Sequence, residues 1–402
     1  MKTFRVAVAA SGLGHVSRGI EAWAQDLGQA LASRGVDTLL CKAAGNPENE
    51  HERVIGCWTR ESPQARRLVR RLPRFLGWRL GLGSGYGVEQ TTFAWNLLGL
   101  LRRERIDLLH VQDPQLALLV QRANRLGLVR TRSILAHGTE EPLDFQRRIT
   151  YLQHLAPWHL EESRAAGVYK PTWTAIPNFI DTERFAPRDA KTESKALALR
   201  SELDIPPSAL VVLSVSAIKQ HHKRIDYVLR EFAAVRRKRP DLPVWLVIAG
   251  GWEQDTDELI RYGERCLGDR VRFLVRFPRA SMPELYRAAD LFVLGSLKEM
   301  MPIALLEATS SGLPSLVNQH PVMQWMIGAG GRAIDMATEG SLAAELQPLL
   351  ADDALRRQLG QQAREHCIAN FSEDAVVEQI LAYYEQILSP APQAAAALAA
   401  ST

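Results

Sequence analysis

The chain has 402 residues and a mass of 44.8 kDa, the length of two or three average domains. Hydrophobic residues make up 46% and charged residues 23%, a composition that can fill complete cores and excludes a wholly disordered chain. The formal net charge is only +4, and no RNA- or DNA-binding module is visible. We therefore expect no nucleic-acid partner.

The cysteines and the first residues bear on the compartment. Cys41, Cys57, Cys266 and Cys367 show no C-x-x-C spacing, which disfavours a disulfide framework or a zinc site and favours free thiols. No apolar run reaches the ~18 residues of a membrane span. Residues 4–8 resemble a first strand rather than a signal segment, because Arg5 interrupts them. We expect a cytoplasmic protein, and peripheral contact with the inner face of a membrane stays open.

Short β-branched apolar runs alternate with longer amphipathic stretches. In chain order, strands are expected at 5–9, 38–41, 108–111, 133–136, 210–215, 244–248, 271–275 and 291–294. Helices are expected between them, among others at 20–34, 115–126, 225–238 and 282–289. This alternation predicts an α/β fold with two parallel sheets covered by helices.

A polar stretch near 186–200 interrupts the pattern and predicts a linker between two domains. The predicted organisation is an N-terminal domain over 1–190, a C-terminal domain over 191–371, a last helix over 372–388 and a disordered Ala/Pro-rich tail over 389–402. Ser372 is the expected N-cap of the last helix.

A loop of small residues follows the first expected strand and contains Gly12 and Gly14. Small residues at a strand–helix junction let backbone N–H groups approach a phosphate. Ser17 stands where the third glycine of a dinucleotide fingerprint would lie, which disfavours a dehydrogenase. A plain strand–helix turn is an equally good interpretation of this loop alone.

Two glutamates stand eight residues apart after the strand expected at 291–294. Glu299 follows that strand directly, and Glu307 lies in a helix-like segment, 303–310. Ligands of open α/β sheets bind at the carboxyl edge of the strands, where two carboxylates can accept hydrogen bonds from sugar and ribose hydroxyls. Two ordinary surface glutamates are the alternative.

A basic loop lies between the strand at 210–215 and the helix at 225–238. It contains Lys219, Lys223 and Arg224, which suit a diphosphate. A solvated basic loop is the alternative. The neighbouring His221 and His222 lack nearby acids or thiols, so we predict no metal site.

Two further features have structural interpretations when taken alone. The segment 176–181, Ile-Pro-Asn-Phe-Ile-Asp, has turn chemistry at a domain edge. His137 precedes a glycine at the end of an expected strand, where it would reach a ligand or serve as a buried structural residue.

Taken in order, these features resemble the retaining glycosyltransferases of family 4, which have the GT-B fold. The resemblance covers residues 4–388: a Lys after a strand (Lys223), two glutamates eight apart (Glu299 and Glu307), and a small-residue segment ending in Gly-x-Pro (308–314). Segment 176–181 matches the family's I-P-N-G-V-D with Phe179 for the glycine. The implied fold is two Rossmann-like domains facing a central cleft, the first binding the acceptor and the second the donor.

The resemblance implies roles for single residues. Lys223 would hold the diphosphate of a nucleotide-sugar donor, Glu307 the ribose, and Glu299 the transferred sugar, while His137 would face the sugar near the reacting carbon. The implied catalytic residues are His137, Lys223 and Glu299. The implied donor-binding residues are Gly12, Gly14, Ser216, Lys219, Lys223, Arg224, Glu299, Met300, Met301 and Glu307.

Two departures from the family pattern concern the donor. Ala217-Ile218 stands where the family often has Gly-Arg, so Lys219 or Arg224 would have to replace that arginine. Pro302 has no N–H to offer a sugar hydroxyl. The sequence therefore leaves open the sugar, the base (uridine or guanosine), the acceptor, the linkage and the oligomeric state.

The implied activity is transfer of a sugar from a UDP- or GDP-linked donor to a hydroxyl of a glycan, glycolipid or small molecule, with retention and without a metal or other cofactor. Two alternatives remain: a GT-B-like sugar-nucleotide epimerase, and a catalytically degenerate partner protein that binds nucleotide sugars.

A basic stretch at 60–79 carries seven arginines against one acid, with apolar residues interleaved. Arg66, Arg67, Arg70 and Arg71 suit an anionic membrane surface or a lipid-linked, phosphate-bearing acceptor. A solvated helix face with a packed apolar stripe is an equal alternative. Pro73 is expected to break the helix, and the glycine-rich segment 77–87 is expected to be flexible.

Overall fold

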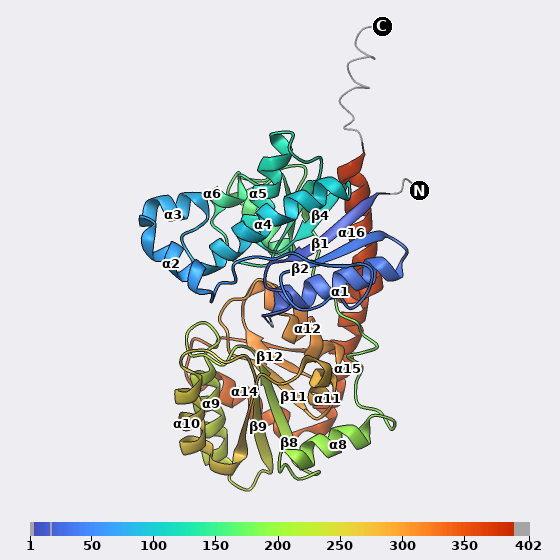
Figure 1. The fold of residues 1–402 in the computed structure, drawn as a ribbon. Coiled ribbons are helices and arrows are strands. Elements are labelled where there is room, and N and C mark those ends of the chain that lie inside the picture. The colour runs from blue at the N-terminus through green and yellow to red at the C-terminus, as the bar shows by residue number, and fades with distance from the viewer. Residues whose placement is uncertain (1–3, 17, 390–402) are drawn as a thin grey trace. The chain divides into compact units, whose positions relative to one another are not determined.

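The computed structural model describes residues 4–16 and 18–389, which form two compact units (Figure 1). The first unit comprises the described residues up to Ile176 together with those from Val377 onward. The second unit runs from Pro177 to Val376. Each unit is a parallel sheet covered by helices and has its own hydrophobic core, as the strand–helix alternation predicts.

The sheet of the first unit has the strand order β3-β2-β1-β4-β5-β6-β7, and all its pairs are parallel. The strands are β1 (Arg5–Ala10), β2 (Asp37–Lys42), β3 (Glu52–Val54), β4 (Leu108–Val111), β5 (Arg132–His137), β6 (Tyr151–His154) and β7 (Thr174–Ala175). The central strands β1, β4 and β5 are buried almost throughout, as expected for strands covered on both faces. The strand order reverses between β1 and β4, which makes their carboxyl ends the switch point of this sheet.

The helices of the first unit are α1 (Gly19–Ser33), α2 (Pro63–Arg71), α3 (Arg74–Leu80), α4 (Gly85–Arg103), α5 (Pro114–Arg125), α6 (Leu143–Gln146) and α7 (Pro157–Ala165). Helix α1 buries Trp23, Leu27 and Leu31 at helical spacing, which fixes the face it turns to the sheet. The side chain of Ser62 accepts a hydrogen bond from the Ala65 N–H and caps α2.

The sheet of the second unit has the order β10-β9-β8-β11-β12-β13, again all parallel. Its strands are β8 (Leu210–Val215), β9 (Val244–Gly250), β10 (Val271–Val275), β11 (Leu291–Leu294), β12 (Ser315–Asn318) and β13 (Gly331–Ile334). The order reverses between β8 and β11, which places the switch point of this sheet at their carboxyl ends.

The helices of the second unit are α8 (Glu193–Glu202), α9 (Ile225–Lys238), α10 (Thr256–Leu267), α11 (Met282–Arg287), α12 (Ile303–Ser310), α13 (Pro321–Ile327), α14 (Ser341–Ala351) and α15 (Asp353–Phe371), with 3₁₀ turns at Gly268–Arg270 and Arg279–Ser281. Figure 1 shows α9 and α10 on one side of the sheet and α11, α12 and α15 on the other. Helix α16 (Glu373–Leu388) begins in this unit, with Ser372 Oγ accepting from the Ala375 N–H, and continues in the first unit.

The division between the units falls after Ile176, whereas the sequence pattern placed it at residue 190. Segment 177–190 belongs to the second unit because its backbone is held there. The Ile180 N–H bonds to the Phe371 carbonyl, the Phe185 carbonyl accepts from Ser310 Oγ, and Arg287 donates to the Ala186 carbonyl. The linker-like composition of 186–200 marks a surface connection leading to α8.

Pro73 separates α2 from α3, as expected. The segment 77–87, expected to be flexible, contains the end of α3 at Leu80 and the start of α4 at Gly85. Ser84 Oγ accepts from the Gly87 N–H and caps α4, which compensates for the helix-weakening glycines. The tail expected over 389–402 lies outside the described residues, apart from Ser389. No helix among the described residues has the length and apolar content of a membrane span.

Candidate functional site

The loops after β8 and β11 bring the predicted donor residues of the second unit together. Lys223 lies at the end of the first loop and Glu299 in the second, and the Lys223 ammonium donates to Glu299 Oε1. Both side chains are largely buried, so this is a shielded ion pair at the switch point of the sheet. The two positions are 76 residues apart in sequence and meet because β8 and β11 are neighbours.

The Arg224 side chain contacts Tyr227 and Met336 and not the Lys223–Glu299 pair. Arg224 has a left-handed backbone (φ +52°), and its guanidinium lies 4.2 Å from the ring centre of Tyr227 and donates to the Met336 carbonyl at 2.6 Å. Lys219 is half-buried and has no ion-pair partner among the described residues. Of the two replacements considered for the family's arginine, Lys219 therefore has the uncommitted charge.

The backbone N–H groups of Ser216 and Ile218 both have hydrogen-bond partners in the second unit. The Ser216 N–H donates to the Ala249 carbonyl at 3.0 Å, and the Ile218 N–H donates to Gly251 at 3.0 Å. These amides complete the pairing with β9, so they have no proton to offer a phosphate. The role of Ser216 in donor binding stays a prediction.

Side chains from neighbouring loops fix the segment around Glu299. Asn318 Nδ2 donates to the Leu297 carbonyl at 2.8 Å, and His222 Nε2 lies 3.0 Å from the Lys298 carbonyl oxygen. His222 therefore serves as a contact between these two loops.

Asn178 fixes the other end of that segment. Its N–H lies 3.1 Å from Met301 Sδ, and its side-chain amide donates to the Met301 carbonyl at 3.3 Å. Both residues are buried. The Pro-Asn segment, interpreted from sequence as structural, thus positions Met301, which lies two residues after Glu299.

Glu307 lies buried on α12, one helical turn beyond the loop. The Tyr286 hydroxyl donates to Glu307 Oε2 at 2.7 Å. Burial and the Glu307 carboxylate both raise the pKa of Tyr286 well above 10, so the phenol stays protonated and orients the carboxylate. The sequence analysis did not identify Tyr286, which lies in a short helix whose apolar spacing indicates only a core position.

In the first unit, His137 ends β5 and is buried. Burial, with a smaller effect of His159, lowers the pKa of His137 to about 3, so the ring is neutral near pH 7. Its Nε2 accepts from the Glu141 N–H at 3.4 Å, which places the ring proton on Nδ1. Within the described residues, Nδ1 is buried without a hydrogen-bond partner.

Gly12 and Gly14 have packing reasons of their own. A Cβ on Gly12 would lie 2.1 Å from Glu21 Oε1, and one on Gly14 would lie 2.1 Å from the Ala44 carbonyl oxygen. Gly14 also has a left-handed φ of +98°, which favours glycine. These two residues therefore fit the plain-turn interpretation without any ligand.

A buried polar cluster, missed by the sequence analysis, surrounds this glycine loop. Glu89 on α4 is fully buried and accepts from the Arg60 N–H at 2.7 Å and from the Arg60 guanidinium, while His15 Nε2 lies 3.0 Å from it. Burial alone would raise the pKa of Glu89, but these hydrogen bonds outweigh it and lower the pKa to about 2. Arg60 was counted from the sequence as one of many surface arginines.

The same cluster continues through Tyr86. The Arg18 and Arg60 guanidinium carbons lie 5.3 and 4.6 Å from its ring centre, and its hydroxyl donates to Asp113 at 2.5 Å. Asp113 follows β4 and also accepts from the Ser11 N–H at 2.6 Å, so it joins the two loops at the switch point. Burial raises the pKa of Asp113 despite these bonds.

Glu21 completes the cluster. Arg18 donates to its Oε1 at 2.9 Å, whereas Oε2 is buried without a hydrogen-bond partner in the part of the chain that the structure describes. An unpartnered carboxylate oxygen beside the switch point is suited to accept a hydrogen bond from a bound hydroxyl. Its sequence signal, an acidic residue in the first turn of α1, was too common to stand out.

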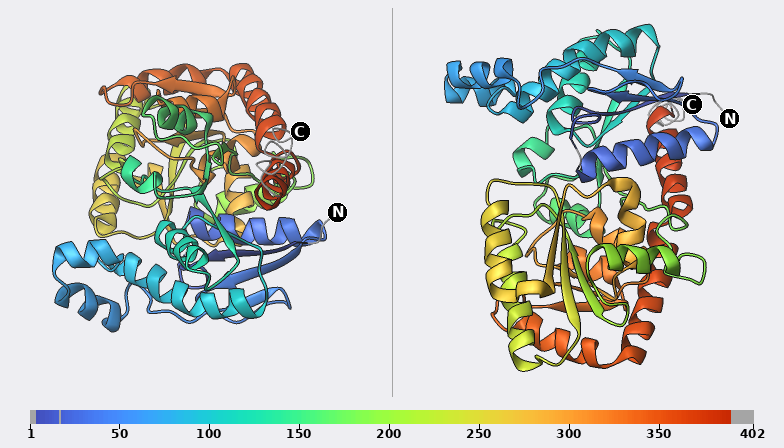
Figure 2. Two further views of the ribbon diagram at one scale, coloured as in Figure 1. Left: turned by 90° about the horizontal axis from the view of Figure 1, so that it is seen from above. Right: turned by 60° about the horizontal axis from the view of Figure 1, so that its bottom comes forward.

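The four arginines assigned to an acceptor or membrane surface, Arg66, Arg67, Arg70 and Arg71, lie exposed on α2. Beside them α3 exposes Phe75 (76%) and Trp78 (68%). In both views of Figure 2, α2 and α3 project from the end of α4 away from the first sheet. The alternative of a packed apolar stripe does not account for these two aromatic side chains.

Potential metal ligands do not cluster within residues 4–16 and 18–389: no group of three His, Cys, Asp or Glu side chains there could hold a metal ion.

Comparison with known proteins gives two adjacent family matches. The model described as "Glycosyl transferase 4-like domain" matches residues 18–178, and the model described as "Glycosyl transferases group 1" matches residues 197–366. Each match falls largely within one of the two units. The D-inositol 3-phosphate glycosyltransferase of Salinispora arenicola is 32% identical over 225 residues, which are 53% of this chain and 50% of the relative.

The alpha-galactosylglucosyldiacylglycerol synthase of Streptococcus pneumoniae is 26% identical over 249 residues, 60% of this chain and 62% of the relative. The chain thus spans about half the length of the curated relatives it matches.

Solved structures agree in fold. A sucrose-phosphate synthase from Thermosynechococcus elongatus matches with a TM-score of 0.73 at 19% identity, over 96% of this chain and 99% of the other. Anabaena HepE in complex with UDP and glucose matches with a TM-score of 0.72 at 14% identity, over 95% and 100%. With both sheets and both family matches in place, the resemblance inferred from the motifs is confirmed: the chain belongs to the family 4 glycosyltransferases, which have the GT-B fold.

Proposed function

We propose that the protein is a retaining glycosyltransferase that moves a sugar from a UDP- or GDP-linked donor to a hydroxyl of a glycan, glycolipid or small-molecule acceptor. The observation that carries this proposal is the meeting of Lys223 with Glu299 at the β8/β11 switch point, with Glu307 on the helix that follows. The similarity to a D-inositol 3-phosphate glycosyltransferase and to an alpha-galactosylglucosyldiacylglycerol synthase supports the reaction class.

The charges of this site match a nucleotide diphosphate sugar. A departing diphosphate is anionic, and a shielded ammonium stabilises it more strongly than one in water. Binding of the donor would draw Lys223 from Glu299 toward the phosphates, which frees the Glu299 carboxylate to accept from sugar hydroxyls. Glu307, oriented by Tyr286, would bind the ribose.

The proposed reaction needs no covalent intermediate on the protein. The acceptor hydroxyl attacks the anomeric carbon on the face that the diphosphate leaves, and the departing phosphate oxygen takes the hydroxyl proton. His137, neutral with its proton on Nδ1, would donate a hydrogen bond rather than take a proton. The proposed reaction requires neither a metal ion nor another cofactor.

The first unit is the proposed acceptor side. Its polar cluster offers Glu21 Oε2 as an acceptor for a hydroxyl and Arg18 as a partly exposed donor. The fixed network of Tyr86, Glu89 and Asp113 holds these groups in place.

A donor screen tests the proposed function. We expect a UDP- or GDP-sugar to raise the melting temperature of the protein and to release its nucleotide slowly without an acceptor. The measurement is thermal shift and saturation-transfer NMR against UDP- and GDP-linked hexoses, with nucleotide release followed in parallel. If no nucleotide sugar binds, the transferase proposal is wrong; tight binding without transfer to any acceptor would favour the degenerate partner protein.

We further propose that α2 and α3 contact an anionic membrane that carries a lipid-linked acceptor. Exposed arginines next to exposed aromatic side chains are typical of such contacts. At about 1 kcal/mol per arginine near the surface, changing Arg66, Arg67, Arg70 and Arg71 to Gln should weaken binding to phosphatidylglycerol vesicles about 1,000-fold. Co-sedimentation of protein with vesicles measures this loss.

The matched control changes four exposed cations elsewhere to Gln: Arg102, Arg103, Arg237 and Lys238. This control should bind vesicles nearly as well as the unchanged protein. Equal losses in both variants would mean that overall charge, and not this surface, attracts the vesicles. A wild-type protein that stays in the supernatant would contradict the membrane proposal altogether.

A further inference from the structure

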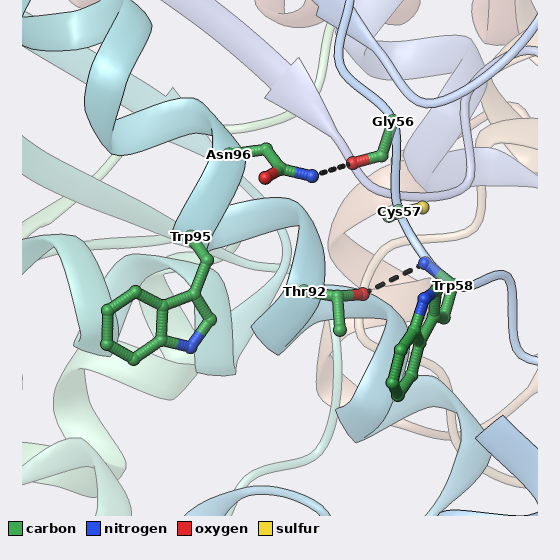
Figure 3. A pocket seen from close by; sticks show the side chains of 6 residues that line it. All are labelled: Gly56, Cys57, Trp58, Thr92, Trp95 and Asn96. Atoms are coloured by element: carbon green, nitrogen blue, oxygen red, sulfur yellow. Dashed lines mark hydrogen bonds between the residues drawn. The ribbon is translucent and has the colours of Figure 1, made fainter. Parts of the chain in front are cut away.

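A hollow of about 390 Å³ opens on the surface of the first unit, with an exposed tryptophan on either side (Figure 3). Its lining residues are Gly56, Cys57, Trp58, Thr92, Trp95 and Asn96. The side chains of Trp95 and Trp58 are 69% and 45% exposed. The donor reaction described above uses none of these residues.

One wall of the hollow is formed by residues 56–58, and three side chains of α4 hold the segment 56–60 in place. Asn96 donates to the Gly56 carbonyl at 2.5 Å, and Thr92 Oγ1 accepts from the Trp58 N–H at 3.0 Å (Figure 3). Glu89, one turn earlier on the same helix face, accepts from the Arg60 N–H. The segment 56–60 is thereby fixed along α4, so the hollow is preformed rather than the result of a loose loop.

The hydrogen bonds between α4 and segment 56–60 also link the hollow to the polar cluster. Arg60, at the end of that segment, binds Glu89 and lies over Tyr86, whose hydroxyl reaches Asp113 at the switch point. The segment that lines the hollow is therefore connected through α4 and Arg60 to the polar cluster of the same unit.

The indole side chains of Trp58 and Trp95 are not part of the hydrophobic core of the first unit. The core of the first unit is filled by other residues of α4, Phe93, Leu97 and Leu101 among them, which lie on its opposite face. Trp58 and Trp95 leave large apolar surfaces in water, an arrangement typical of a binding surface.

The chemistry of the hollow fits a sugar ring. Pyranoses present an apolar face of C–H groups, which packs on an aromatic ring, and a rim of hydroxyls, which needs donors and acceptors. Here the indoles supply the rings, and Asn96, whose nitrogen is held by Gly56, turns its amide oxygen away from that bond. None of the six lining residues is charged, which disfavours a phosphate or a lipid headgroup as the occupant.

The hollow is suited to bind a ligand and not to catalyse a reaction, because the thiol of Cys57 in its lining is protonated. Burial, and to a lesser degree the Glu89 carboxylate, raises the pKa of the Cys57 thiol to about 12. Cys57 is thus a protonated, unreactive thiol near neutral pH.

We propose that this hollow binds a sugar ring of the acceptor between Trp58 and Trp95. The inference rests on the proposed transferase function and narrows its acceptor to a molecule that already carries a sugar, in preference to a single polyol. An earlier glycosyl transfer must therefore supply the substrate of this protein.

A binding experiment tests the proposal without turnover. The probes are the methyl α- and β-glycosides of glucose, galactose, mannose and N-acetylglucosamine, with maltose and lactose, each followed by saturation-transfer NMR and tryptophan fluorescence. We expect at least one probe to bind in the millimolar range. Trp58→Ala and Trp95→Ala should each weaken it about fivefold or more, whereas Trp58→Phe and Trp95→Phe should keep part of the affinity.

Trp158→Ala, which removes a 37% exposed indole from α7 of the same unit, is the matched control and should bind within about twofold of the unchanged protein. Binding of no probe, or equal binding by all variants, would overturn the proposal. Loss of vesicle binding with unchanged sugar binding would also overturn it and assign the two indoles to a membrane surface. UDP binding, measured in the same samples, reports separately on the donor site.

Discussion

Replacement of Lys223 by methionine is expected to lower the rate of sugar transfer about 100- to 1,000-fold, the usual cost of removing one preorganised group that stabilises developing charge. Methionine keeps most of the side chain's length and removes its charge. The departing diphosphate would then form without its ammonium partner, and the exposed or half-buried cations nearby, Lys219 among them, would replace it only in part. Steady-state kinetics with the donor identified by the screen measures the loss.

The same change also affects the fold, because it leaves the Glu299 carboxylate largely buried without its cation. Breaking such a pair costs about 3 kcal/mol of unfolding free energy. The double variant Lys223→Met with Glu299→Gln removes the unpaired charge, so it should regain stability without regaining activity. If activity returns together with stability, Lys223 serves the fold and not the reaction. Lys238→Met, at the far end of α9, is the control and should change neither.

The elements that sequence reasoning located best are buried strands and the helices next to them. The expected bounds of β4, β8, β10, β11 and the helix α9 match the structure residue for residue. These segments are apolar on both faces or strictly amphipathic, so local pattern and tertiary packing agree. The strands β12 and β13 were missed because they are only four residues long and include Ser, Asn, Gly and Arg.

Lys223, Glu299 and Glu307 could be named from the sequence as candidate donor residues because a recognisable order of motifs contains them. Their contacts could not be predicted, since pairs such as Lys223 with Glu299 or Asn178 with Met301 are separated by 76 and 123 residues. The hydrogen-bond partner of the Ser216 N–H could not be predicted for a related reason. A strand end can be placed from sequence, but the partner of its last N–H depends on the neighbouring strand.

The polar cluster proposed as the acceptor side was harder to predict, because each of its residues taken singly resembles an ordinary surface residue. Arg60 stands among seven arginines, and Glu89 follows a glycine-rich start of α4. Only the packing of α4 against the glycine loop brings them into one buried network with Tyr86. A count of charges along 60–79 therefore predicts that Arg60 is exposed to solvent, whereas its side chain is largely buried. The arginines of α2 are exposed, as expected.

Three of the buried histidines in the first unit, His110, His137 and His154, make its stability depend on pH. Burial is the main cause that lowers the pKa of each to about 3. An unfolded histidine binds its proton near pH 6.5. Below that pH the unfolded chain therefore takes up protons that the folded chain refuses, and stability falls as the pH is lowered from 6.5 toward 3.

The expected loss between pH 7 and pH 5 is about 2 kcal/mol per histidine, or about 6 kcal/mol of unfolding free energy in total. That is as large as the whole stability of many domains, so the first unit should open in mild acid. Glu89, whose pKa of about 2 lies below its ordinary value of 4.5, adds to the loss only below pH 4.5 and leaves this window to the histidines. Hydrogen exchange of peptides from β4, β5 and β6 between pH 7 and 5 measures the effect in this unit.

Replacing His154 by glutamine separates the histidines from other causes of acid sensitivity. His154 Nε2 lies 3.3 Å from Ser163 Oγ, a contact that a glutamine amide can replace, and its Nδ1 is buried without a hydrogen-bond partner within the described residues. Because glutamine does not titrate, the variant should lose about 2 kcal/mol less than the unchanged protein between pH 7 and 5. A variant that loses as much as the unchanged protein would show that the buried His154 ring does not exclude its proton, and that the acid sensitivity arises elsewhere in the unit.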